Sequence, residues 1–237
     1  MIKALLLAAG LGTRLRPLTY ETPKCLVEIN GQPLLGRWIE KLEDIECETI
    51  VINTHYLSNK VEEYLSAINK RNIILSHEEQ LLGTARTLMR NKEIFRDGIG
   101  LIIHADNCTD FNLSKLIDAH NNRPKSCVMT MLTFNSNDPK SCGIVRTDED
   151  GILKEFYEKV ENPPGNRANA AIYAIDKRLI DSLENMKPEP IDFSNDVLPS
   201  MLGRVYTHHT MARFLDIGTP KSLHEAQSYW KSPEVKP

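Results

Sequence analysis

Residues 7–24 read LAAGLGTRLRPLTYETPK and directly follow a continuous apolar run, Ile2–Leu7. Such a run is typical of a central parallel strand that is covered on both faces. The small residues from Ala8 to Gly12 allow backbone N–H groups to approach a ligand closely and to cradle phosphates. The spacing is neither a Walker P-loop, which needs Gly-Lys-Ser/Thr, nor a dinucleotide GxGxxG motif, because position 15 is Leu15. The positive charges that accompany this predicted phosphate loop are Arg14, Arg16 and Lys24.

Strands and helices alternate through the first half of the sequence. Apolar runs predict strands at 2–7, 49–52, 73–76, 99–103 and 128–133. Helical spacing predicts helices at 34–42, 57–68, 84–89 and 113–120, with Pro33 suited to the first turn. This βαβα order predicts an α/β fold with a doubly wound, mostly parallel mixed sheet.

The pattern changes after about residue 135. Runs at 143–147 and 152–157 flank Asp148-Glu149-Asp150-Gly151, which is a hairpin signal. Further elements are expected as strands at 168–175, 205–208 and 211–215, and as helices at 179–183, 192–201 and 220–230. Asp192 is suited to capping the second of these helices, and Thr219 followed by Pro220 to starting the third. We expect this half to extend the same sheet with a small β elaboration.

Composition excludes several classes of protein. The chain has 237 residues, and its 29 Lys+Arg against 32 Asp+Glu give a net charge of −3. Nonspecific binding of nucleic acid needs an excess of clustered positive charge, so none is expected. Five cysteines without a CxxC pair are typical of reduced thiols in a cytoplasmic protein. No apolar run approaches the roughly 18–20 residues that span a bilayer, so neither a membrane segment nor a secretion signal is expected.

The loop and several later blocks together resemble one family. Residues 10–24 match the pattern GxGTRLxPLTxxxPK of sugar-1-phosphate nucleotidyltransferases, the nucleotide-sugar pyrophosphorylases. Further blocks follow in the family's order: LGTA at 82–85, HADN at 104–107, GIV at 143–145, Glu158-Lys159, Asn169 and DIGTP at 216–220. The resemblance covers about residues 2–230. It implies a Rossmann-like nucleotidyltransferase domain over 1–237, with a nucleotide-binding half (1–134), a sugar-phosphate-binding half (135–237) and no C-terminal β-helix domain.

The resemblance implies a role for each matching residue. Nucleotide binding is expected at Leu7, Ala8, Ala9, Gly10, Gly12, Thr13, Arg14, Lys24, Glu78, Gln80, Gly83 and Thr84. Sugar-phosphate binding is expected at Asn107, Gly143, Glu158, Lys159 and Asn169. The expected catalytic residues are Arg14, Lys24 and Asp106, and the expected Mg²⁺ ligands are Asp106 and Asp216.

The implied reaction is attack of a sugar-1-phosphate oxygen on the α-phosphorus of an NTP, which releases pyrophosphate and forms a nucleotide-sugar. The main difficulty is charge repulsion between two anions, so electrostatic stabilisation and in-line positioning are expected to supply most of the catalysis. Mg²⁺ suits two carboxylates that are completed by phosphate oxygens and water. No Ser-His-Asp or Cys-His arrangement suggests a covalent nucleophile.

The choice of substrates rests on fewer residues. Glu78-Glu79-Gln80 resembles the Glu-rich segment of mannose-1-phosphate guanylyltransferases, and a glutamate can accept from guanine N1 and N2. GTP and a mannose-1-phosphate-like sugar are therefore favoured. Arg86 and Ala171 depart from the family's usual glycines and leave both preferences open. Uridylyl, thymidylyl or cytidylyl transfer, a phosphocholine acceptor, a non-catalytic sensor of nucleotide-sugars and a homo-oligomer all remain alternatives.

Overall fold

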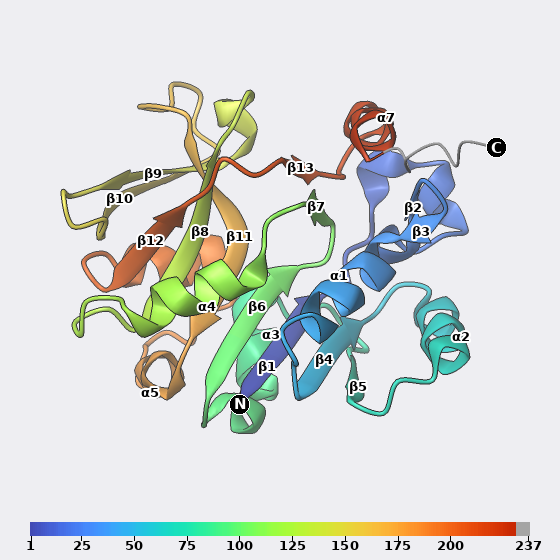
Figure 1. Ribbon diagram of the computed structural model, residues 1–237, viewed down its shortest axis with the longest axis horizontal. Helices are drawn as coiled ribbons and strands as arrows, with labels where there is room; N and C mark the ends of the chain where they lie inside the picture. The colour runs from blue at the N-terminus through green and yellow to red at the C-terminus, as the bar shows by residue number, and fades with distance from the viewer. Residues whose placement is uncertain (231–237) are drawn as a thin grey trace.

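The computed structural model describes residues 1–230, and a nine-stranded mixed sheet forms its centre (Figure 1). Seven strands run in the order β10-β9-β11-β6-β1-β4-β5, while β8 pairs with β11 and β12 pairs with β8. The parallel part is built from β1 (Ile2–Leu7), β4 (Thr49–Thr54), β5 (Ile73–His77) and β6 (Ile99–His104). This arrangement confirms the doubly wound, mostly parallel α/β fold, with β1 between β4 and β6 as expected of a strand that is mainly apolar.

The second half of the chain joins the same sheet, as the sequence predicts. Its strands are β8 (Met129–Asn135), β9 (Gly143–Thr147), β10 (Leu153–Glu158), β11 (Arg167–Ile175) and β12 (Val205–His209). β11 runs antiparallel to β6 and links the two halves, and β9 and β10 form the predicted hairpin. An isolated antiparallel bridge between Ile152 and Tyr206 joins this hairpin to β12, so the two ends of the second-half strands meet.

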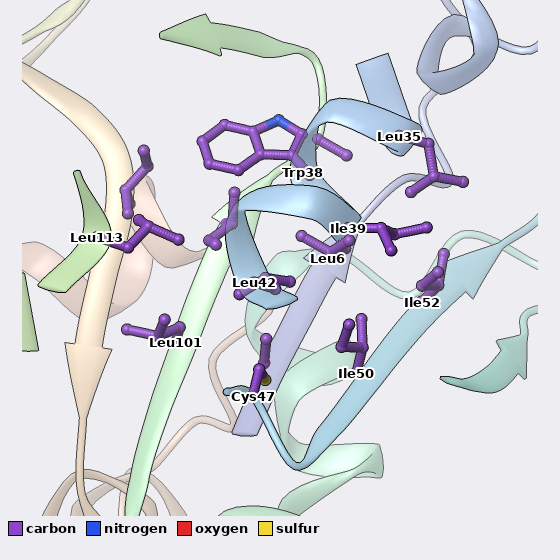
Figure 2. Close-up of a cluster of buried hydrophobic side chains, with 14 of the residues drawn as sticks. Leu6, Leu35, Trp38, Ile39, Leu42, Cys47, Ile50, Ile52, Leu101 and Leu113 are labelled. Atoms are coloured by element: carbon purple, nitrogen blue, oxygen red, sulfur yellow. The ribbon is translucent and has the colours of Figure 1, made fainter. Parts of the chain in front are cut away.

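Helices cover both faces of the sheet. α1 (Leu34–Glu43), α2 (Ser58–Ile68) and α4 (Leu113–Asn121) pack on one face, and α3 (Thr84–Arg90) and α5 (Lys177–Glu184) pack on the other. Figure 2 shows the first layer, in which Trp38 and Leu42 of α1 lie over Leu6 of β1. Leu5 and Leu6 alternate between the two core layers, which explains why the middle of β1 is apolar on both faces. No helix among the described residues is both long and apolar enough to cross a membrane.

Several short elements were not predicted. They are the strands β2 (Glu28–Ile29), β3 (Gln32–Pro33) and β7 (Asn107–Thr109), and the 3-10 turns at Thr13–Leu15, Leu18–Tyr20, Lys24–Leu26, Lys92–Phe95 and Pro139–Ser141. Pro33 ends β3 in an extended conformation instead of entering the first turn of α1. Elements of two or three residues carry no periodicity, so the sequence gives no signal for them.

Three predicted elements end elsewhere. The strand expected at 211–215 is β13 (Phe214–Asp216), because the backbone N–H groups of Ala212 and Arg213 bond to Thr210 and Asp110 side chains and bend the chain first. The helix expected at 192–201 is a π-helical turn (Phe193–Val197) followed by α6 (Leu198–Ser200), with Asp192 as its cap. The last helix, α7 (Pro220–Tyr229), has the predicted Thr219 cap, and residues 231–237 of the predicted domain lie outside the described part.

Candidate active site

A cavity of about 230 Å³ opens at the carboxyl ends of β1, β4 and β6. This edge is where open α/β sheets bind their ligands. The residues that line it are Leu7, Ala8, Ala9, Gly10, Lys24, Cys25, Asn53, Glu78, Leu81, Gly83, Thr84, Thr87, His104 and Asp106. The structure thus brings the first part of the predicted phosphate loop together with the segments at 83–84 and 104–106.

The loop after β1 is held by side chains from distant parts of the chain. The Ala8 backbone N–H donates to Asn53 Oδ1 at 2.7 Å, and Thr19 Oγ1 donates to the Gly12 carbonyl at 2.7 Å. Gly12 has φ +62°, and a Cβ there would lie 2.9 Å from Thr19 Cγ2, so this turn requires glycine. Fixed backbone N–H groups are what a phosphate-binding loop needs.

Glu78 is buried and fully engaged by protein donors. Its carboxylate accepts from Asn53 Nδ2 at 2.9 Å, Thr87 Oγ1 at 2.6 Å and the Leu82 backbone N–H at 3.1 Å. These bonds tie β4, β5 and α3 together around the cavity. The structure therefore gives Glu78 a positioning role, and its direct contact with a guanine base stays a prediction.

The second loop is docked against the other half of the chain. Gly83 has φ +92°, and the Ala85 backbone N–H at the start of α3 donates to the Ile191 carbonyl at 2.9 Å. Thr84 Oγ1 donates to Asp192 Oδ2 at 2.9 Å and accepts from the Phe193 N–H at 2.7 Å. Segment 191–193 therefore fixes the loop that contributes Gly83 and Thr84 to the cavity.

Lys24 joins two carboxylates that lie far apart in the sequence. Its Nζ lies 2.5 Å from Asp106 Oδ2 and 3.4 Å from Asp216 Oδ1. Arg14 Nη2 adds a contact of 3.7 Å to Asp216 Oδ2. Burial raises the pKa of the Asp106 carboxyl, but the neighbouring Lys24 ammonium outweighs burial and holds this pKa below its usual value. Asp106 is therefore ionised at neutral pH.

The backbone explains why these two aspartates meet. β7 and β13 pair side by side, with Asn107 opposite Asp216, and the Ile217 N–H donates to the Asp106 carbonyl at 2.9 Å (Figure 1). Two carboxylates that already share one ammonium cation form a hard-oxygen donor set suited to Mg²⁺. Among residues 1–230 no three His, Cys, Asp or Glu side chains gather to hold a metal alone, so substrate oxygens and water would complete its coordination.

Two further side chains in the cavity were not predicted to function. Burial raises the pKa of the Cys25 thiol to about 12, so it carries no thiolate at neutral pH. Burial also lowers the pKa of His104 despite the nearby Asp106, Asp192 and Asp216 carboxylates, which keeps the imidazole neutral. Neither Cys25 nor His104 is therefore charged at neutral pH.

The predicted sugar-phosphate residues lie outside this cavity, and their polar side chains contact protein groups. Glu158 Oε1 lies 3.0 Å from Lys159 Nζ, and a Cβ on Gly143 would lie 2.6 Å from Glu158 Oε2. Asn169 Nδ2 donates to the Tyr173 hydroxyl at 2.7 Å. Asn107 is buried, and its Nδ2 donates to the Ala170 carbonyl at 3.2 Å. The end of the β9–β10 hairpin therefore unites Gly143, Glu158 and Lys159 but not Asn107.

Other predicted residues stand at the rim or elsewhere. Gly12, Thr13, Arg14 and Asp216 do not line the cavity, although the last two reach Lys24 or its partners. Gln80 lines a separate, polar hollow with His77, Glu79, Leu82 and Arg90. Sequence reasoning missed Asn53, Thr87, Leu81, Cys25 and His104 as lining residues. Asn53 and His104 had a usable signal, because each lies at the carboxyl end of a predicted parallel strand.

Known proteins share both the sequence pattern and the fold. A family model described as nucleotidyl transferase matches residues 3–232. The catalytic subunit beta of mannose-1-phosphate guanylyltransferase from Drosophila melanogaster is 34% identical over 93% of this chain, and the chain spans 60% of that relative's length.

Two solved structures share the fold alone, since each is under 25% identical. A Bacillus anthracis protein assigned as a glucose-1-phosphate thymidylyltransferase, solved with sucrose, has a TM-score of 0.87 at 20% identity, covering 100% of this chain and 98% of its own. HddC from Yersinia pseudotuberculosis, complexed with GMP-PN, has a TM-score of 0.79 at 24% identity, covering 98% and 100%. With a family model matched over nearly its whole length, this chain belongs to the nucleotidyl transferase family.

Proposed function

We propose that this protein transfers the guanylyl group of GTP to a mannose-1-phosphate-like sugar, releasing pyrophosphate and forming a nucleotide-sugar. The observation that carries the proposal is the convergence of Lys24, Asp106 and Asp216 beside a loop whose backbone N–H groups border a cavity. That arrangement supplies fixed charges where a polyanion and an anionic nucleophile must meet. The Drosophila relative's name supports guanine and mannose as the first substrates to test.

The positive charges of Lys24 and Arg14 have two different proposed roles. An oxygen of the sugar phosphate attacks the α-phosphorus, and the bond to the β-phosphate oxygen breaks as pyrophosphate leaves. Lys24 is placed to hold phosphate oxygens near Asp106, and the exposed Arg14 is placed to hold the departing pyrophosphate. Such preorganised charges stabilise the developing negative charge without rearranging during the reaction.

Asp106 and Asp216 are the residues that would hold Mg²⁺. When bound, Mg²⁺ neutralises phosphate charge and favours in-line geometry. Lys24, which contacts both carboxylates, would then share them with the metal. Glu158 and Lys159, at the end of the β9–β10 hairpin, are proposed to contact the sugar phosphate from the second half of the chain.

The direct test is pyrophosphate release with Mg²⁺, crossing GTP, ATP, CTP, UTP and dTTP with mannose, glucose and N-acetylglucosamine 1-phosphates and phosphocholine. We expect the highest kcat/KM for GTP with mannose 1-phosphate, and loss of Mg²⁺-dependent turnover in Asp106→Asn and Asp216→Asn. The variant Asp118→Asn, on the exposed side of α4, is the matched control. Faster turnover with another nucleotide would contradict the choice of base, and undiminished turnover in Asp216→Asn would contradict the shared metal site.

A further inference from the structure

One polar side chain of the cavity lacks a protein partner. His104 Nε2 is buried and has no hydrogen-bond partner within the described residues. The other lining side chains that carry nitrogen or oxygen all hydrogen-bond to protein groups: Lys24, Asn53, Glu78, Thr84, Thr87 and Asp106. An unpaired buried polar atom is costly, so its presence in a cavity points to a ligand that satisfies it.

His104 lies where the two halves of the molecule meet. It is the last residue of β6, where it pairs with Leu7 of β1, the first residue of the phosphate loop. On the other side of β6, the ladder with β11 ends at the pair of Ile103 and Ile172, one residue before His104. The imidazole thus lies between the nucleotide loop and the strand that carries Asn169.

The charges around His104 are those of the proposed reaction centre. Asp106, two residues after His104, lines the same cavity and lies 2.5 Å from Lys24 Nζ, which in turn lies 3.4 Å from Asp216 Oδ1. A group among these charges faces the junction of the two substrates. The base is expected on the other side of the cavity, where Asn53, at the end of β4, and Glu78 line it.

We propose that His104 is a substrate-contacting residue that hydrogen-bonds a ring hydroxyl of the sugar 1-phosphate and so contributes to the choice of sugar. A hydroxyl both donates and accepts, so either tautomer of the imidazole satisfies it. The proposal rests on the proposed function and deepens it. The nucleotide ribose also carries hydroxyls near this junction, and the experiment separates the two.

The test compares wild type, His104→Leu and His104→Gln with mannose 1-phosphate and its 2-, 3-, 4- and 6-deoxy analogues. Loss of one neutral hydrogen bond is expected to lower kcat/KM about fivefold to tenfold. We expect the kcat/KM of wild type to fall by this factor with the one deoxy analogue that lacks the contacted hydroxyl. We expect the kcat/KM of His104→Leu to be lower by the same factor with mannose 1-phosphate, and to fall no further with that analogue. His104→Gln, which retains a donor and an acceptor, is expected to recover part of the loss.

The exposed His224→Leu, on α7, is the control and is expected to behave as wild type. Equal penalties for every deoxy analogue in wild type and His104→Leu would overturn the proposal. So would a loss in His104→Leu that vanishes with 2′-deoxy-GTP or 3′-deoxy-GTP instead, because that would assign the imidazole to the ribose.

A calorimetric titration keeps this test separate from the proposed reaction. Mannose 1-phosphate is titrated into the protein with Mg²⁺ and a non-hydrolysable GTP analogue. If wild type binds the sugar phosphate but releases no pyrophosphate, the proposed function fails, while weaker binding by His104→Leu still supports the contact. Identical binding by the two proteins, or no binding by wild type, would overturn it.

Discussion

Lys24 is the side chain on which the candidate site most depends. It is buried, with side-chain exposure of 10%, and its ammonium lies between Asp106 and Asp216. Two carboxylates held close together without a cation repel each other, and burial increases the cost. Lys24 therefore offsets the repulsion between the two aspartates and keeps Asp106 charged, because its ammonium holds the pKa of that carboxyl below its usual value.

Replacing Lys24→Met retains the length of the side chain and removes its charge. We expect kcat/KM for pyrophosphate release to fall about 100-fold, because a preorganised charge at the phosphates is lost. The control is Arg16→Met, which removes a positive charge from the same segment, where the guanidinium lies 5.0 Å over the exposed Tyr20 ring. Activity within threefold of wild type in Lys24→Met, measured with saturating Mg²⁺, would contradict this role.

The start of α3 shows how one helix depends on a segment more than 100 residues away. Its Ala85 N–H is capped by the Ile191 carbonyl, and Thr84 bonds to Asp192, which itself caps the π-helical turn through the Ser194 and Asn195 N–H groups. Backbone N–H groups at a helix start need partners, and here another segment provides one. The two halves of the site are therefore joined by structure as well as by substrate.

Gly83→Ala tests this junction. Gly83 has φ +92°, and an added Cβ would lie 2.5 Å from the Ile191 carbonyl oxygen. We expect the free energy of unfolding to fall by about 2–4 kcal/mol, because backbone strain adds to a steric clash. Urea denaturation measures the change. Gly165→Ala, in a loop where nothing lies within 4 Å of the added Cβ, should leave stability close to wild type, and equal effects would contradict the predicted clash.

Helix α4 packs on the central sheet in one of the two core layers, and a buried histidine on this helix makes the stability of the whole molecule sensitive to acid. His120 on α4 is buried, and its Nδ1 lies 3.1 Å from Thr130 Oγ1. Burial, reinforced by Arg123, lowers the pKa of His120 to about 3 from its usual 6.5. The unfolded chain takes up this proton below pH 6.5 whereas the folded protein does not, so the stability decreases as the pH falls from 6.5 toward 3.

For His120 alone, this difference corresponds to about 2 kcal/mol at pH 5. Urea denaturation at pH 7 and pH 5 measures the decrease in the free energy of unfolding on acidification. We expect this decrease to be about 2 kcal/mol smaller in His120→Gln than in wild type. The exposed His224→Gln should keep the wild-type pH dependence. Parallel losses in wild type and His120→Gln would mean that another group dominates the response to acid.

Much of the architecture follows from local patterns in the sequence. The apolar run at 2–7, the helical spacing of α1 and the DEDG hairpin each determine an element through contacts within a few residues, and all three form as predicted. Two of the elements that sequence reasoning missed or misplaced, β7 and β13, are three residues long and pair with each other. Long-range pairing leaves no periodic signal along the chain.

The sequence by itself determined the mostly parallel sheet, the phosphate loop and the presence of Lys24, Asp106 and Asp216 in matching motifs. Only the tertiary structure decided how they combine, because the contacts join residues far apart: Lys24 and Asp216 are separated by 192 positions. It also engaged Glu78 with protein donors and placed Gln80 in another hollow, and among residues 1–230 it gave His104 Nε2 no hydrogen-bond partner. Whether a polar side chain is free for a ligand depends on which groups the fold brings within hydrogen-bond distance, and the order of residues does not specify that.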